Sequence, residues 1–198
     1  KENFSYKAGQ YINIEAEIDG KNVRRSYSIC SSEDENLSVL VKKIPEGVFS
    51  HFAMHQLEED TKLGVQEPQG KFTLSPEHAD KTLMAFAAGS GITPMMSLIK
   101  THLGNRDSSK FILVYGNQSS EKTIFKDQID ELKNTYPDRF FVKYVFSRSN
   151  EENSIYGRID ASVVNRMLNK VYTKYDIKKF YICGPEAMTT TVADTLKN

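Results

Sequence analysis

The chain has 198 residues, of which 26 are Lys or Arg and 26 are Asp or Glu, so its formal net charge at pH 7 is zero. This balance provides no overall field that would attract nucleic acid or an anionic membrane, and the length suffices for one or two domains. No apolar run approaches the roughly 18 residues of a membrane-spanning helix, and no signal-peptide pattern is found at the start of the sequence.

The first predicted element is a β-hairpin. Apolar and polar residues alternate over residues 11–18, as in a half-buried strand, and Asp19-Gly20 is typical of a tight turn. On the return strand, alternation places Arg25 and Tyr27 on one face and Ser28 on the other. A cation beside an aromatic ring can hold a ligand that is anionic at one end and flat at the other, such as a flavin nucleotide. A polar surface strand would show the same pattern.

Further strands are predicted at residues 22–29, 37–44 and within 62–73. Their close spacing is typical of a small β-sandwich or barrel. After residue 44, Gly47-Val48-Phe49-Ser50 begins a helix whose N-terminus can bind an anion, although Ser50 would also serve as an ordinary cap. His51 and His55 lie one turn apart in this helix, and two histidines do not complete a metal site. We predict no metal.

The pattern changes near residues 75–80, which we interpret as a linker between a domain of residues 1–76 and one of residues 77–198. Beyond it, strands and helices alternate. The predicted strands are 82–88, 111–115, 140–146 and 179–183, and the predicted helices are 94–103, 120–134, 160–168 and 185–196. Several of these strands are apolar throughout, as parallel strands buried on both faces are. The sequence therefore predicts an antiparallel β-barrel followed by a doubly wound, parallel-sheet α/β domain.

A glycine loop, Gly89-Ser90-Gly91-Ile92-Thr93-Pro94, joins the first of these strands to its helix. Glycines let a backbone approach phosphate closely, and Thr93 before Pro94 is typical of a helix cap followed by a first turn. The free N–H groups of the helix N-terminus would attract an anion. The loop is not the G-x-G-x-x-G fingerprint, because Pro94 occupies the third glycine position.

Cys183-Gly184-Pro185 ends the last predicted strand. In a doubly wound sheet this strand lies beside the first one, and the loops of both flank the crevice where ligands bind. We therefore expect the glycine loop and Cys183 to face each other across one cleft. Cys183 could instead be an inert buried thiol, and Gly184-Pro185 a simple helix start. The other cysteine, Cys30, makes no metal-type spacing with Cys183, which agrees with a reducing cytosol and a cytoplasmic protein.

Taken in order, R-x-Y-S, G-x-x-S, G-x-G-x-x-P and C-G-P resemble the ferredoxin–NADP reductase superfamily over essentially the whole chain. Residues 6–11, 68–72, 114–117 and 157–160 more closely resemble the reductase component of phenylacetyl-CoA oxygenases. The resemblance implies an FAD-dependent NAD(P)H reductase that passes electrons from NADPH through FAD to an iron–sulfur centre feeding an oxygenase, in phenylacetate or aromatic degradation.

Those relatives continue into a C-terminal 2Fe–2S ferredoxin domain, which this chain lacks. The family's first barrel strand and last α/β strand are also missing, so we expect a piece of a longer protein. A 2Fe–2S cluster is then expected only in a further C-terminal domain, and the expected partner is a ferredoxin-type domain or an oxygenase component. The alternatives are a free-standing reductase of a ferredoxin or haem protein, and a non-catalytic flavin- or nucleotide-binding subunit.

The resemblance also implies roles for single residues. Arg25 would neutralise the FAD pyrophosphate, Tyr27 would pack on the isoalloxazine, and Ser28 would hydrogen-bond near the hydride-accepting N5. Cys183 would lie beside the nicotinamide, so Ser28 and Cys183 are the residues expected at the reacting atoms. Other expected FAD ligands are Val41, Lys42, Gly47, Val48, Phe49 and Ser50, and other expected ligands of the nicotinamide cofactor are Gly89, Gly91, Thr93, Gly184 and Pro185.

The choice between NADPH and NADH depends on the ends of two strands. The second α/β strand is followed by residues 116–118, which include no acidic residue that would favour the ribose of NADH. The third ends at Ser147-Arg148, which resembles the family's 2′-phosphate-binding pair. We expect NADPH, with NADH as the alternative if Arg148 is only a solvated loop residue or if Glu151 and Glu152 weaken its field.

Overall fold

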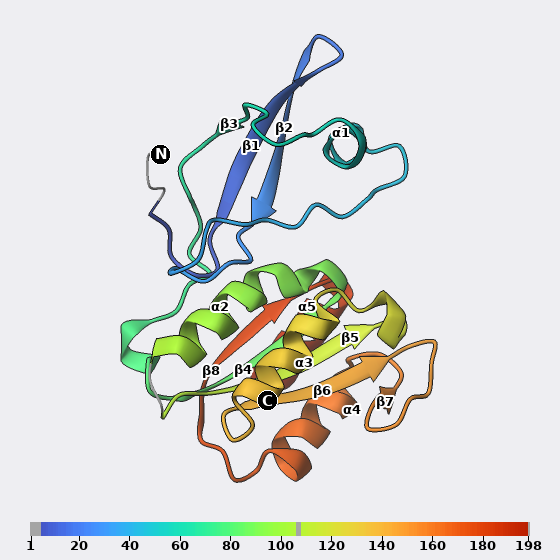
Figure 1. Cartoon of the computed structure of the whole chain (residues 1–198). Coiled ribbons are helices and arrows are strands. Elements are labelled where there is room, and N and C mark those ends of the chain that lie inside the picture. Colours follow the sequence, from blue (N-terminus) through green and yellow to red (C-terminus); the bar gives the residue numbers. More distant parts are fainter. Residues whose placement is uncertain (1–4, 106–107, 198) are drawn as a thin grey trace.

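The computed structural model describes residues 5–105 and 108–197, which form an antiparallel sheet stacked on an α/β domain (Figure 1). The antiparallel sheet contains β1 (Tyr11–Ile18), β2 (Lys21–Ser28) and β3 (Gly64–Val65) in the order β2-β1-β3. The predicted turn is present, since Asp19 and Gly20 have φ angles of 51° and 71°. The inward face of β1 packs in one cluster with Phe49 of helix α1 (Val48–His55).

The predicted strand at residues 37–44 is wrong. Only Val39 forms a bridge, with Ile29, and the rest of the segment is irregular. Leu37, Val39 and Val41 do pack against the core cluster of the N-terminal domain, so their alternation reflects burial and not a ladder. Residues 62–73 likewise contribute only β3 and a bridge from Gln69 to Tyr11. Within the described residues, the N-terminal domain is an open three-stranded antiparallel sheet.

The second domain is a parallel sheet of five strands in the order β7-β6-β5-β4-β8. Its strands are β4 (Thr82–Ala88), β5 (Lys110–Asn117), β6 (Phe140–Phe146), β7 (Ile155–Tyr156) and β8 (Ile177–Cys183). The chain moves outward from β4 to β7 and returns with β8 beside β4, pairing in parallel. This confirms the doubly wound fold, with β7 as a strand that the sequence did not indicate.

Helices cover both faces of the parallel sheet. α2 (Ile92–Asn105) and α3 (Lys126–Thr135) pack on one face, and α4 (Ala161–Arg166) and α5 (Glu186–Lys197) on the other. Short 3-10 helices lie at η1 (Pro76–His78), η2 (Gly89–Gly91) and η3 (Ser120–Lys122), and a short π-helix η4 (Met167–Val171) follows α4. The predicted helix 120–134 is interrupted before α3, where Phe125 has a left-handed φ of 60°.

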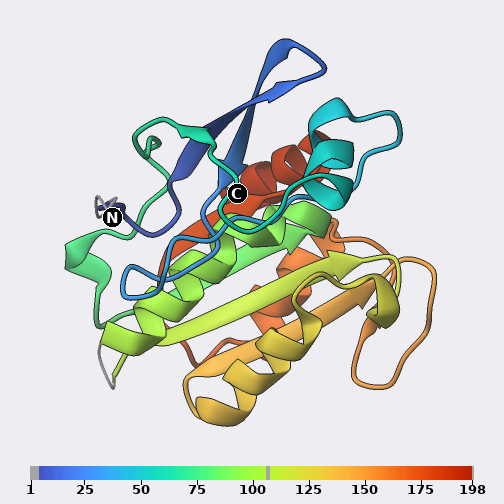
Figure 2. The same ribbon diagram turned by 45° about the horizontal axis from the view of Figure 1, so that its top comes forward.

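Helix α2 lies between the two sheets (Figure 2). Its apolar residues share one buried cluster with Ala8 and Cys30 of the N-terminal domain. On the same interface the hydroxyl of Tyr181 in β8 donates to the Thr73 carbonyl over 3.1 Å. The two domains are therefore joined by a common core. The expected boundary at residues 76/77, within η1, stays a prediction.

Candidate functional site

The glycine loop lies at the carboxyl end of β4 and packs directly against the end of β8. Gly89 has a φ of +53° in open space, so the backbone conformation favours glycine there. Gly91 is required for another reason, because a Cβ at this position would lie 2.1 Å from the carbonyl oxygen of Cys183. The structure thus brings together the two loops that the sequence predicted on one cleft.

The predicted cap at Thr93 is wrong. η2 runs directly into α2, which begins at Ile92, so Thr93 is already inside the helix. Its hydroxyl donates to the Ser90 carbonyl over 2.9 Å instead of accepting from a backbone N–H. Thr93 is also buried, so its side chain supports the turn from inside the protein. Pro94 does lie in the first helical turn, where its missing N–H costs nothing.

Cys183 is the last residue of β8 and is half-buried. Burial raises the pKa of its thiol, so the group stays protonated at neutral pH. It therefore offers a small apolar surface and not a nucleophile. Gly184 follows in close contact with β4, where an added Cβ would lie 3.2 Å from the Cβ of Ala88. α5 begins directly after Pro185.

Arg25 and Tyr27 lie on the inward face of the hairpin, as the alternation predicted. They stand opposite Ile14 and Ile12 in the ladder, and both isoleucines are buried. The ring of Tyr27 is half-buried, with its centroid 5.5 Å from that of Phe49. The guanidinium of Arg25 is exposed and donates to the carbonyl of Arg24 over 2.7 Å.

Ser28 lies where β2, an edge strand of its sheet, ends. Its ladder partner Tyr11 exchanges both backbone hydrogen bonds with Gln69 on the other side, at 2.9 and 2.8 Å. Because bonded and non-bonded pairs alternate in an antiparallel ladder, the backbone N–H and carbonyl of Ser28 point away from β1, toward the side on which Ile29 bridges Val39. A flat ligand can therefore lie on Tyr27 and still meet Ser28 at the strand edge.

The turn at residues 47–50 leads into α1. A Cβ on Gly47 would lie 2.6 Å from the Ser50 hydroxyl oxygen, which explains the glycine. The Ser50 hydroxyl donates to the Gly47 carbonyl over 3.0 Å and accepts from the Ile44 N–H over 3.2 Å. Phe49 is buried against the core. These two side chains hold the turn together, and the first backbone N–H groups of α1 have no acceptor within the helix.

The surroundings of this turn are open on one side. A cavity of about 300 Å³ lies against it and is lined in part by Lys43, Gly47 and Val48. The remaining predicted FAD ligands precede the turn, where Val41 is half-buried in the N-terminal core and Lys42 is exposed.

Ser147 and Arg148 follow directly on β6, beside the end of β5. Their backbone N–H groups donate to the carbonyls of Asn117 and Gln118 over 3.0 and 2.9 Å. The Arg148 side chain is exposed. Glu151 turns toward η3, where hydrogen bonds from the Ser149 hydroxyl and the Ser120 N–H lower the pKa of its carboxyl. The Glu151 carboxylate therefore faces the Ser149 hydroxyl and the Ser120 N–H.

One aromatic residue beside this pair was missed by the sequence argument. Tyr156 in β7 pairs with Phe146, the residue before Ser147, and is 65% exposed. An exposed ring at a sheet edge is available to stack on a flat base. In the sequence, Tyr156 is only an aromatic residue just before Gly157. Its position beside Ser147 and Arg148 becomes evident only from the pairing of β7 with β6.

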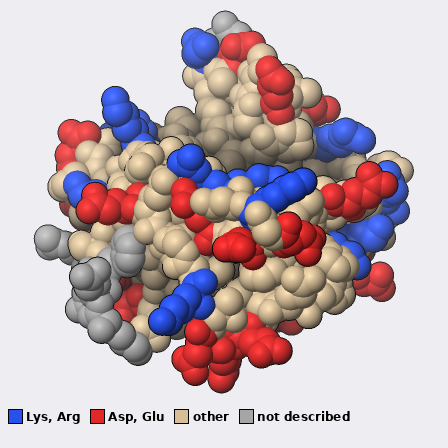
Figure 3. All heavy atoms as spheres, turned by 90° about the horizontal axis from the view of Figure 1, so that it is seen from above, with Lys and Arg blue, Asp and Glu red and all other residues tan. Residues whose placement is uncertain are grey.

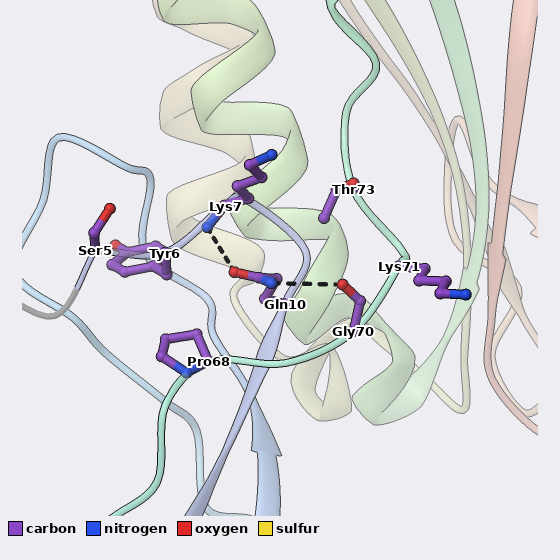
Figure 4. A pocket seen from close by; sticks show the side chains of 8 residues that line it. All are labelled: Ser5, Tyr6, Lys7, Gln10, Pro68, Gly70, Lys71 and Thr73. Atoms are coloured by element: carbon purple, nitrogen blue, oxygen red, sulfur yellow. Dashed lines mark hydrogen bonds between the residues drawn. The ribbon is translucent and has the colours of Figure 1, made fainter.

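Further surface features involve residues that are not among the predicted ligands. A cavity of about 450 Å³ lies between residues 5–10 and 68–73, and Gln10 bridges its rim to Lys7 and Gly70 (Figure 4). The rings of His51 and His55 lie 4.6 Å apart, and the described residues contain no group of three metal-ligating side chains.

Seen from above, basic and acidic side chains are mixed over the visible face (Figure 3). None of the helices in the described ranges combines the length and apolar character that a membrane crossing requires.

Comparison with known proteins gives consistent matches. Residues 1–74 match the family described as "Oxidoreductase FAD-binding domain" and residues 86–194 match "Oxidoreductase NAD-binding domain". The chain is 34% identical to a subunit of the 1,2-phenylacetyl-CoA epoxidase from Escherichia coli (strain K12), over 100% of this chain and 56% of that protein. It is 29% identical to the glycine betaine monooxygenase reductase subunit of Chromohalobacter salexigens, over 98% of this chain and 53% of the relative.

The fold has a close match among solved structures. The CS-b5R domains of human Ncb5or, in the NAD⁺ form, superpose with a TM-score of 0.81 at 25% identity, over 96% of this chain and 57% of that one. The chain thus spans little more than half of the two curated relatives, at 56% and 53% of their lengths.

Proposed function

The chain belongs to the ferredoxin–NADP reductase-like oxidoreductases, which join an FAD-binding to an NAD-binding domain, and from this premise we propose that it moves electrons from NADPH through FAD to an iron–sulfur centre. One observation carries the proposal. Cys30, two residues beyond Ser28, belongs to the same buried cluster as Ala87 of β4 and Ile92 of the glycine loop. The strand proposed to bind flavin therefore ends at the same buried core that holds the loop proposed to bind nicotinamide dinucleotide.

The residues around β2 fit FAD. Arg25 carries an exposed guanidinium, and the start of α1 offers backbone N–H groups, so together they can neutralise a pyrophosphate. Tyr27 would support the isoalloxazine ring, and the strand edge at Ser28 would supply hydrogen bonds near its reacting nitrogen. Since the Ser50 hydroxyl is engaged within the turn, we assign the anion contacts of this segment to backbone N–H groups.

The carboxyl ends of the parallel strands fit NADPH. The glycine loop would bind the pyrophosphate, Ser147 and Arg148 the 2′-phosphate, and Tyr156 would stack on the adenine. Cys183 would border the nicotinamide as a protonated thiol and limit its position. Bound FAD would supply the redox chemistry that connects a two-electron hydride donor to a one-electron acceptor. These residues would set the distance and orientation of the nicotinamide relative to the flavin. We assign no general acid or base.

The electron acceptor is inferred from the relatives. Both curated relatives described above are named as parts of enzyme systems, one an epoxidase of phenylacetyl-CoA and the other a monooxygenase of glycine betaine. We therefore propose that the partner is a ferredoxin-type domain or an oxygenase component, and that the pathway is phenylacetate or aromatic degradation.

Rapid anaerobic mixing of the FAD-loaded protein with NADPH and, separately, with NADH tests this function. We expect the flavin absorbance to bleach with both donors, at lower concentration with NADPH. Bound FAD that neither donor reduces would contradict the reductase function and favour a non-catalytic subunit. A C-x₄-C-x₂-C spacing encoded beyond Asn198 would identify the iron–sulfur acceptor.

A further inference from the structure

The phenol of Tyr115 is directed at the glycine loop from inside the protein. Tyr115 lies in β5 and is fully buried. Its hydroxyl donates to the Gly89 carbonyl over 3.0 Å and lies 3.3 Å from the Ile124 carbonyl. Burial raises the pKa of this phenol, so it keeps the proton that it donates. The Gly89 carbonyl also accepts from the Ile92 N–H and so has two donors.

The orientation of this carbonyl determines where the next N–H points. In a planar trans peptide, the C=O and N–H bonds point in opposite directions. With the Gly89 carbonyl turned inward to Tyr115, the N–H of Ser90 is turned outward, and Ser90 is an exposed residue. Ser90 is the second residue of η2, so its N–H has no acceptor within that turn.

Without the phenol, the Gly89 carbonyl would keep only the Ile92 N–H as its donor, and the orientation of this peptide would be held less firmly. A flip of this peptide changes the ψ angle of Gly89 and the φ angle of Ser90, and Gly89, which has no Cβ, restricts its ψ angle less than any other residue would. A flip would turn a carbonyl oxygen toward the bound anion and withdraw the N–H. We propose that Tyr115 is a positioning residue that keeps the Ser90 N–H presented to the pyrophosphate of the nicotinamide dinucleotide. This inference rests on the proposed function.

Calorimetric titration of the FAD-loaded protein with two ligands tests the inference. NADP⁺ contains the pyrophosphate, whereas adenosine 2′-monophosphate contains only the adenosine and 2′-phosphate end. We expect Tyr115→Phe, which keeps the ring, to weaken NADP⁺ binding about fivefold and to leave adenosine 2′-monophosphate binding unchanged. The matched control is Tyr144→Phe in β6, whose hydroxyl donates to Asp130 over 3.1 Å and should affect neither ligand.

The outcomes separate the inference from the function. Unchanged NADP⁺ affinity in Tyr115→Phe, or equal loss of both ligands, would overturn the positioning role while the reductase function stands. Wild-type protein that binds neither NADP⁺ nor NAD⁺ would overturn both. If the variant does not fold, a titration of the wild-type protein with inorganic pyrophosphate, followed by amide NMR, decides the matter. We expect the Ser90 N–H to shift strongly, and no shift there would overturn the inference.

Discussion

Ser97 of α2 donates its hydroxyl to the backbone carbonyl of Ser31 over 2.6 Å, and both residues are buried. α2 begins at the glycine loop, and Ser31 follows Ser28 by three positions in the chain. One hydrogen bond thus links the segment that follows the proposed flavin strand to the helix that follows the proposed nicotinamide loop. Since hydride transfer requires close and defined contact, this interface bears on function as well as on stability.

Ser97→Ala removes this link. The Ser31 carbonyl would be left buried without its donor, so we expect the free energy of unfolding to fall by about 1–3 kcal/mol. Denaturant titration measures this loss. Thr191→Ala is the control, because that hydroxyl donates to the Ala187 carbonyl on an exposed helix face. Equal stability of the Ser97 variant and wild type would show that the interface does not depend on this bond.

The same interface predicts a pH dependence through Glu35. Burial opposes ionisation of this carboxyl, but hydrogen bonds from the Ser32 N–H and the Lys100 ammonium outweigh it and lower its pKa. A lowered folded-state pKa gives stability that is present above the unfolded pKa of about 4.3 and is lost as pH falls through the folded value. Glu35→Gln should therefore destabilise the protein at pH 7, and the difference should vanish in acid.

The control for Glu35 is Glu17→Gln on the exposed face of β1. We expect this variant to be as stable as the wild type at pH 7, because the side chain is exposed. A Glu35→Gln difference that stays constant from pH 7 into acid would exclude the ionised hydrogen bonds as its source.

Substitution by alanine at three glycines between residues 89 and 104 should change the free energy of unfolding by different amounts. At Gly91 the new Cβ would meet a backbone oxygen that cannot rotate away, so we expect a loss near 3 kcal/mol. At Gly89 only the left-handed φ opposes a side chain, at a cost of about 1–2 kcal/mol. At Gly104, in α2 with open space around it, alanine should stabilise by up to about 1 kcal/mol. Thermal unfolding ranks the variants, and any other order contradicts these assignments.

The fold could be predicted from the sequence where a continuous run of apolar residues forms one buried element. β4 begins and ends at the residues predicted from its apolar run, because a strand buried on both faces leaves an unmistakable composition. Residues 37–44 alternate as clearly as a strand, but a ladder needs a neighbour and only Val39 finds one. Alternation reports which side is buried, not whether the backbone is paired.

The site was predictable only in its linear motifs. The glycine loop and the end of β2 stand out because glycine, arginine and tyrosine occur at fixed spacings. The contact between Tyr115 and Gly89 joins residues 26 positions apart and exists because β4 and β5 pair in one register, with Ala87 beside Tyr115. Thr93 was misassigned as a cap since η2 extends the helical turn upstream, which composition does not reveal.

The hairpin offers two adjacent arginines as a matched pair. Arg25 lies on the proposed flavin face, whereas Arg24 lies on the opposite face and forms an ion pair with Glu15 at 3.3 Å. Because a hydrogen bond to a charged group contributes about 1.5–3 kcal/mol, Arg25→Ala should weaken FAD binding by about ten- to a hundredfold. Arg24→Ala should leave FAD affinity unchanged in flavin fluorescence titrations. Equal effects of both substitutions would refute the assigned orientation of the ligand.

Arg148 should determine the preference for NADPH. Its side chain is exposed beside Ser147, while Glu151 is engaged with Ser120 and Ser149, so the Arg148 guanidinium is available to a 2′-phosphate. We expect Arg148→Ala to lower kcat/KM for NADPH by about ten- to a hundredfold and to leave kcat/KM for NADH unchanged. Arg166→Ala, at the exposed end of α4, is the control. If the ratio of the two kcat/KM values stays at the wild-type level in Arg148→Ala, the 2′-phosphate is bound elsewhere, because the guanidinium contributes only when that phosphate is present.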